Sequence, residues 1–222
     1  RTPGLGEKPG SIVVTAMDSN PLAPEIPLVL RGKEQFFRAG LTLLSRLTEG
    51  KVFVCHASGA DIPLPDNIQV DAVEFSGPHP AGNAGTHIHL LAPVTRTNKV
   101  WQVNAGDVAA FGALFLEGRL DTERIISLAG PQAVEPRLVR TRQGACVSEL
   151  VEGECKAGMR RIISGSVLHG HRAEGSLDYL GRYHNQVSVI EASRSRPFLG
   201  WLNPGLNLFS LNHFSHHHYF AK

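Results

Sequence analysis

The sequence predicts a fold of the α/β class, with a mostly parallel sheet in its first half and a smaller strand-rich domain after it. Up to about Gly130, short apolar runs alternate with segments of helical periodicity, a pattern typical of a parallel sheet covered by helices. A β-sandwich would need closely spaced hairpins without helices between them, and the first half of the sequence lacks that spacing. After Pro131 helical patterns become scarce, which predicts a β-rich second domain.

The first elements are a strand, a loop and a helix. SIVVTAM (11–17) is short and β-branched, as in a buried strand. DSNPLAP (18–24) contains two prolines, and because residues before proline avoid the helical region, it is expected to be an extended loop. A helix is predicted from Glu34 to Leu47, where apolar residues recur at helical spacing, and it stops near Gly50.

The rest of the first half adds strands and one more helix. KVFVCHA (51–57) and the alternating IQVDAVEF (68–75) are expected to be strands. VWQVN (100–104) is a further strand that leads into a helix ending at Gly118. TERIISLAGP (122–131) closes this half as its last strand. The helix has an apolar stripe that we expect to face the core, made of Val108, Phe111, Leu114 and Phe115.

The second half has the pattern of a few strands around one short helix. PRLVRT (136–141), RRIISGSVLHG (160–170) and QVSVIEA (186–192) have the composition of strands. SELVEG (148–153) is the short helical segment between them. This texture predicts a domain of the β-grasp type.

The change after residue 130 sets the expected domain boundaries. A Rossmann-like α/β domain is predicted over residues 1–130 and a small β-grasp domain over residues 131–205. Residues 206–222 would begin a C-terminal element that the sequence truncates. Since the chain starts at Arg1 without Met and stops within a pattern, we expect it to be a piece of a longer protein.

Composition excludes several classes of function. Basic residues number 22 against 20 acidic ones, a balance without the concentrated basic face of a nucleic-acid binder, so we expect no nucleic-acid partner. No apolar stretch approaches the roughly 18 residues of a membrane helix, so any membrane role should be peripheral. The three cysteines are far apart and form no CxxC pair, which argues against disulfides, a zinc ribbon or an iron–sulfur ligand set and favours a cytoplasmic location.

A glycine-rich stretch, residues 76–93, is the first candidate for a binding site. It places Gly77, Gly82 and Gly85 ahead of an apolar run, and glycines let backbone amides approach a ligand closely. The stretch matches neither GxGxxG nor the lysine-bearing phosphate loop. A tight turn that binds nothing is the alternative interpretation.

Histidines in and after this stretch are candidates for chemistry. His87 and His89 share a face only in a strand, and neither Cys nor a carboxylate lies nearby to complete a metal site, so we predict no metal ligands. Local hydrogen bonding is one role for these histidines and for His79, and proton-linked quinone chemistry is another. The C-terminal histidines are expected to lie on a polar helix surface: His213, His216, His217 and His218.

Two polar segments of the second half are further candidates. LGRYHNQVSV (180–189) could line a ligand pocket or satisfy buried backbone groups at a domain junction. Ser164 and Ser166 have no Ser–His–acid arrangement around them in the sequence, and GSVLHG is not a nucleophile elbow. We therefore expect no hydrolase chemistry and no catalytic residue in this chain.

Five segments are long enough to be compared with known families: FSGPHPAGNAGTHIHLLAPV, VWQVNAGDVAAFGALFLEGRL, LAGPQAVEPRLVRTRQGA, RRIISGSVLHG and YLGRYHNQVSVIE. Together they resemble the A subunit of the Na+-translocating NADH:quinone oxidoreductase. The resemblance runs in order from Arg1 to about Trp201.

The resemblance implies a role within a large enzyme, NADH:ubiquinone reductase (Na+-transporting). That complex couples NADH oxidation and quinone reduction to Na+ export across the bacterial inner membrane, and its A subunit is a peripheral component on the cytoplasmic face. NAD, flavins and iron–sulfur groups belong to partner subunits, the membrane-embedded B subunit is the expected neighbour, and no cofactor is implied for this chain. Ubiquinone binding is associated with the A subunit, and the residues we assign to it are His79, Gly82, Gly85, His87 and His89.

A second resemblance is to the flavin-bearing, NADH-oxidising subunit of complex I. LAGPQAVEPRLVRT and RRIISGS resemble its β-grasp (SLBB-like) domain, and SIVVTAMDSNPLAP stands where it has a strand and an acidic loop. That loop keeps Asp18 but has Asn20 where a glutamate is usual, and His87 and His89 replace two further glutamates. The resemblance implies a flavin-domain scaffold without its cofactor. Two alternatives stay open, a flavin- or NADH-binding module and a purely structural adaptor.

Overall fold

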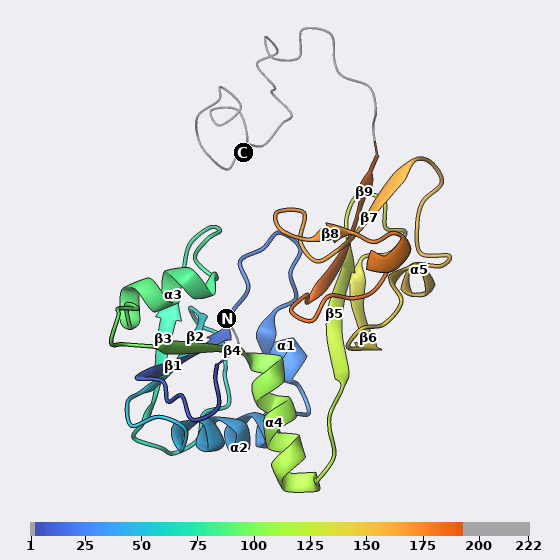
Figure 1. Cartoon of the computed structure of the whole chain (residues 1–222). Helices are drawn as coiled ribbons and strands as arrows, with labels where there is room; N and C mark the ends of the chain where they lie inside the picture. Colours follow the sequence, from blue (N-terminus) through green and yellow to red (C-terminus); the bar gives the residue numbers. More distant parts are fainter. Residues whose placement is uncertain (1–2, 193–222) are drawn as a thin grey trace, which may run out of the picture. The chain divides into compact units, whose positions relative to one another are not determined.

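The structure is a computed structural model that describes residues 3–192 (Figure 1). Residues up to Glu191 form one compact unit. The element expected over residues 206–222 and the four C-terminal histidines lie outside the described residues. Within the described part, no helix has the length and apolarity that crossing a membrane requires.

The first sheet is parallel and has four strands in the order β3-β2-β1-β4. These strands are β1 (Ser11–Ala16), β2 (Val52–Ala57), β3 (Val70–Phe75) and β4 (Val100–Asn104), all at the positions that the sequence predicts. From β1 the chain adds β2 and then β3 on one side of β1. It then crosses back over the sheet and adds β4 on the other side of β1. The strand order therefore reverses between β1 and β4, which is the place where open parallel sheets bind ligands.

Helices cover both faces of this sheet (Figure 1). The short α1 (Ile26–Leu30), α2 (Glu34–Ser45) and α4 (Ala105–Glu117) pack on one face and form the main core with alternate residues of β1 and β2. The fourth helix, α3 (Ala84–Leu91), lies on the opposite face, where its His87 contacts the Phe75 ring. The layers are those of a doubly wound α/β fold.

Helix α4 buries a different face from the one that the sequence predicts. Val108 is buried as expected, but Phe111, Leu114 and Phe115 are exposed, with 69% of Phe115 accessible. The reason is a close helix–helix contact, because a Cβ added at Gly112 of α4 would overlap the backbone of α2. Helices that approach this closely need small residues between them, so the face with glycine and alanines turns inward and the aromatic residues turn outward.

The second sheet contains the remaining strands in the order β6-β5-β9-β7-β8. They are β5 (Glu123–Ala129), β6 (Arg137–Arg142), β7 (Arg160–Ser164), β8 (His171–Arg172) and β9 (Gln186–Glu191). The sequence predicts β5 as the last strand of the first layer, but it pairs antiparallel with β6 and parallel with β9. An apolar strand pattern does not encode which sheet the strand joins, and this one joins the second.

One short helix covers the second sheet. Helix α5 (Val147–Leu150) packs Val147 against β5 and β9, and a 3₁₀ turn spans Gly175–Leu177. The core beneath α5 is separate from the core of the first sheet. The sheet packs around one short helix and has the parallel pair β5 and β9 at its centre, which matches the β-grasp architecture that the sequence predicts.

Candidate functional site

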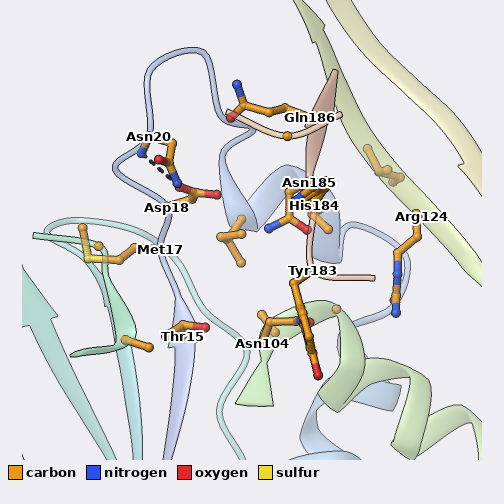
Figure 2. A pocket seen from close by; sticks show the side chains of 18 of the residues that line it. Thr15, Met17, Asp18, Asn20, Asn104, Arg124, Tyr183, His184, Asn185 and Gln186 are labelled. Atoms are coloured by element: carbon orange, nitrogen blue, oxygen red, sulfur yellow. Dashed lines mark hydrogen bonds between the residues drawn. The ribbon is translucent and has the colours of Figure 1, made fainter. Parts of the chain in front are cut away.

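A cavity of about 270 Å³ opens at the carboxyl ends of β1 and β4, where the strand order reverses. Thr15 and Asp18 line it from β1 and the loop after it, and Gln102 and Asn104 line it from β4. The second sheet and the segment before β9 form the other wall (Figure 2). We call this cavity the switch-point pocket.

The loop after β1 is held by its own side chains. The Asp18 carboxylate accepts hydrogen bonds from the Asn20 backbone N–H (3.0 Å) and side-chain amide (2.7 Å), drawn as dashes in Figure 2. Gln186 donates to the Pro21 carbonyl at 3.0 Å, which joins the loop to the start of β9. The Asn20 Oδ1 atom is buried and lacks a partner among the described residues.

A buried carboxylate joins both walls of the pocket. Asp107, in the first turn of α4, is 7% exposed and forms ion pairs with Arg124 of β5 and, at 2.8 Å, with Arg182. The Asn104 side-chain amide donates to the same carboxylate at 2.9 Å, and its oxygen caps the helix by accepting the Asp107 N–H. Such a shared carboxylate fixes α4, β5 and the segment before β9 together.

The cations in the pocket are neutralised by protein groups. The Lys33 Nζ atom lies 2.8 Å from Asp121 Oδ2 and 3.4 Å from Glu123 Oε1. Arg124 forms an ion pair with Asp107. Burial raises the pKa of Asp121, but hydrogen bonds from Lys33 and the Glu123 N–H outweigh it and keep that pKa below its usual range. The pocket therefore offers a phosphate group no free positive charge among the described residues.

The wall before β9 contains the side chain with the most unusual surroundings. His184 lies with its Nδ1 atom 2.9 Å from the Ser164 hydroxyl, and its ring centroid is 5.2 Å from His171 and 6.2 Å from His169. Burial lowers the pKa of His184, and the nearby His171 and His169 lower it further. The imidazole is therefore neutral at physiological pH.

Of the five residues assigned to quinone, Gly82 reaches the pocket wall. Its N–H donates to the Ser19 hydroxyl at 2.8 Å, and the same hydroxyl lies 3.2 Å from Nδ1 of His79. Gly85 is exposed at the start of α3, and His89 is exposed on that helix. The structure thus brings Gly82 and His79 to one loop contact and places Gly85 and His89 at the surface.

His87, the fifth residue, is completely buried. Its Nε2 lies 2.8 Å from the Ala81 carbonyl, and its ring centroid is 4.3 Å from that of Phe75. Burial lowers the pKa of His87, and the bond to Ala81 offsets part of this shift. Residues 3–192 contain no group of three His, Cys, Asp or Glu side chains that could hold a metal ion.

Sequence reasoning missed the Ser164–His184 pair, because 20 residues separate the two positions and no local motif joins them. The sequence predicts that the segment at 180–189 is either a pocket wall or a junction, and it is both. Arg182 makes the junction contact, whereas Tyr183, His184 and Gln186 line the pocket.

Comparisons with known proteins agree with this architecture. Residues 1–120, more than half of the chain, match the family model described as the NqrA second alpha/beta domain. The chain belongs to the NqrA family. Residues 125–175 match the model described as the NQRA C-terminal domain. The resemblance stated from the sequence is therefore confirmed, and the second match begins at β5, which supports the assignment of that strand to the second sheet.

Proteins similar to this NqrA chain are named as the A subunit of Na(+)-translocating NADH-quinone reductase. The one from Pasteurella multocida is 52% identical over 96% of the chain and 48% of its own length. Those from Saccharophagus degradans and Yersinia pestis are 53% and 48% identical, over 95% and 100% of the chain and 47% and 50% of their own lengths. The chain spans about half the length of the curated relatives it matches.

Among solved structures, the NqrA chain is similar to a chain of an NAD+-reducing [NiFe]-hydrogenase. The air-oxidised form gives a TM-score of 0.57 at 15% identity, and the match covers 84% of this chain and 41% of that one. The H2-reduced form gives 0.55 with the same identity and coverage. At this identity the likeness concerns the fold, and it confirms the predicted α/β class.

Proposed function

We propose that this chain is part of the A subunit of a Na+-translocating NADH-quinone reductase, in which NADH oxidation and quinone reduction drive Na+ transport. In this role it is a peripheral component on the cytoplasmic face and docks on partner subunits, the membrane-embedded B subunit first. NAD, flavins and iron–sulfur groups belong to the partners, and the chain alone is not catalytic. The names and identities of its relatives support this role.

We further propose that the switch-point pocket contributes to quinone binding. The observation that carries this proposal is the pocket's lack of an unpaired lysine or arginine, since Lys33 and Arg124 are already paired with carboxylates. The other polar side chains of the lining include Thr15, Gln102 and Asp18, whose carboxylate accepts hydrogen bonds from Asn20. A neutral ring with carbonyl oxygens matches such a lining, because its oxygens need hydrogen bonds and no counter-charge.

The same observation disfavours the flavin mononucleotide and NADH alternatives. Both ligands carry phosphate, which proteins bind with free arginine or lysine, or with clustered backbone amides at a helix start. A phosphate bound through a side-chain cation would require Lys33 or Arg124 to leave Asp121 or Asp107, at the cost of leaving a buried carboxylate unpaired. The purified chain should therefore be colourless and should not quench the fluorescence of added flavin mononucleotide.

A separate observation supports docking on partner subunits. The outward face of α4 exposes Phe111, Phe115 and Leu116, and Leu120 follows just after the helix. Neighbouring exposed apolar residues of this size are typical of surfaces that another protein covers. The structural-adaptor alternative would use this face alone and leave the pocket empty.

Photo-crosslinking of the whole complex with a tail-labelled ubiquinone analogue tests the quinone proposal. We expect label that competes with excess quinone to map by mass spectrometry to residues 15–20 or 181–186. Competable label found only in residues 76–79 or 85–89, away from the pocket-lining residues 82–84, would favour the site predicted from the sequence over the switch-point pocket. Competable label confined to membrane subunits would contradict quinone binding by this chain and favour the adaptor.

A further inference from the structure

The switch-point pocket contains a hydrogen-bond donor whose direction the protein sets before a ligand arrives. We infer that His184 presents its Nε2–H to a carbonyl oxygen of the ligand, with Ser164 as the positioning residue that fixes the ring's tautomer. The identity of the ligand rests on the proposed function, whereas the tautomer follows from the contacts of Ser164 and His184 themselves.

The first step concerns the hydroxyl of Ser164, which is completely buried at the end of β7. The Gly181 N–H donates to Ser164 Oγ at 3.0 Å, and this contact uses a lone pair of the oxygen. The hydroxyl proton then needs an acceptor, because a buried donor without one is strongly unfavourable. In the described part of the chain the acceptor within hydrogen-bond distance is His184 Nδ1, at 2.9 Å.

The second step is the protonation state of the ring. A nitrogen that accepts a hydrogen bond carries no proton, so the neutral imidazole of His184 must carry its proton on Nε2. Burial in the pocket wall, together with the nearby His171 and His169, lowers the pKa of His184, which keeps the ring neutral. Ser164 therefore selects the Nε2–H tautomer.

The third step is access to the pocket. Among described side chains that are not exposed, the buried polar atoms without a partner are Asn20 Oδ1 and His87 Nδ1. His184 Nε2 has no hydrogen-bond partner in residues 3–192 and is not one of those sealed atoms, so it remains accessible. His184 lines the switch-point pocket, and we assign its free N–H to a ligand bound there.

The backbone around the ring holds it in place. A Cβ added at Gly181 would lie 2.5 Å from the His184 Nδ1 atom, and one added at Gly165 would lie 3.0 Å from the ring carbons. Any other residue at either position would push the imidazole away from Ser164. The two glycines thus permit the close fit that keeps the donor in one orientation, which reduces the ordering cost of binding.

The loop opposite His184 is held by its own side chains. The Asn20 amide nitrogen donates to the Asp18 carboxylate, so the other terminal atom of Asn20 is the oxygen, which is sealed from solvent. The donor at His184 therefore suits a small neutral ring that bears a carbonyl oxygen, as in the quinone class.

The tautomer can be measured without any ligand. In the chain labelled with ¹⁵N-histidine, we expect His184 to show an unprotonated Nδ1 and a protonated Nε2 at a pH of about 7.5, above the unperturbed histidine pKa. Ser164→Ala should redistribute the proton between the two nitrogens, whereas His171→Gln, a change beside the ring but outside the pocket wall, should leave the tautomer unchanged. A protonated Nδ1 in the wild-type chain would overturn the inference.

Ligand binding tests the donor itself. A short-chain ubiquinone analogue should bind the His184→Phe variant about tenfold more weakly than wild type, the effect of losing one good hydrogen bond. Ser164→Ala should weaken quinone binding less than His184→Phe does. It replaces His184→Phe as the test variant if that variant does not fold. His171→Gln should bind like wild type.

The two proposals fail in different ways. Quinone binding that is equal in the wild type, His184→Phe and Ser164→Ala would overturn the inference and leave the proposed function standing. If wild type itself does not bind the analogue, alone or in the complex, the proposed function and the assignment of the ligand both fall. The nitrogen measurement then still decides whether Ser164 fixes the tautomer.

Discussion

Two histidines with pKa values lowered by burial lie in opposite situations in this chain. His87 in α3 has its Nε2 against the Ala81 carbonyl, and its Nδ1 is sealed from solvent. His184 lines the pocket with its Nδ1 against Ser164, and its Nε2 has no hydrogen-bond partner among the described residues. The difference teaches that neither the residue type nor the direction of the pKa shift separates a structural histidine from a binding one. What separates them is the identity of the nitrogen that the protein already uses.

The largest expected effect is at the junction on which the His184 wall depends. Asp107→Ala should lower the free energy of unfolding by about 2–4 kcal/mol, because it leaves Arg124 largely buried without its partner. Urea denaturation measures the change. Glu117→Ala removes an exposed ion pair from the same helix and should cost under about 0.5 kcal/mol. Equal losses in the two variants would mean that Asp107 does not join the walls.

The next effect separates the two histidines. His87→Phe keeps a ring against Phe75 but removes the donor to Ala81, and should lower the free energy of unfolding by about 1–3 kcal/mol. Quinone affinity, measured by titration of the folded variant, should be unchanged. A variant of normal stability that loses quinone affinity would show that the loop at 76–89 contacts the ligand after all.

The buried position of His87 should also make the free energy of unfolding depend on pH. His87 titrates at a lower pH in the folded than in the unfolded chain, whose histidines titrate near a pKa of about 6.5. Above the unfolded pKa, His87 is neutral in both states and does not change the stability. As pH falls from the unfolded pKa toward the folded pKa, only the unfolded chain gains a proton, so the free energy of unfolding decreases by at most about 1.4 kcal/mol per pH unit. Unfolding measured about one pH unit above and one below that unfolded pKa should show a smaller loss in His87→Phe than in wild type. An identical loss would contradict this role.

The smallest effect on stability belongs to the exposed face of α4. Phe115→Ser should change the free energy of unfolding by less than about 0.5 kcal/mol, because the residue is already 69% exposed. It should nevertheless weaken assembly into the complex, which size-exclusion chromatography can follow. Leu90→Ser, an exposed apolar position on α3, is the matched control and should assemble normally. Equal assembly of both variants would argue against α4 as the docking face.

Local patterns predicted most of the elements but little of their long-range arrangement. β1 and α2 were predictable because β-branched runs and helical spacing are properties of neighbouring residues. The inward face of α4 was not, because the larger apolar residues dominate any count of hydrophobicity. The closeness of Gly40 and Gly112 to the facing helix decides that face. Glycines within two predicted helices were the available signal.

The residues assigned to quinone from the sequence remain a prediction, and one of them, Gly82, lines the pocket. Proximity of histidines to glycines favoured residues 76–89, whereas His184 comes to the pocket from the segment before β9. The partner of His184, Ser164, is distant in sequence, and only the pairing of β7 with β9 brings the two together. The sequence did contain a local signal for Asp107, because Asn104 followed three residues later by an acidic residue is a helix-capping pattern.

Helix α4 links the switch-point pocket to the exposed apolar face. Its first turn holds Asp107 and borders the switch-point pocket, and its last turns carry the exposed Phe115, about 12 Å away along the helix axis at the usual rise per residue. Between these two sites, Gly112 packs α4 closely against α2. A partner protein bound to Phe115 would therefore contact the same helix whose first turn borders the pocket.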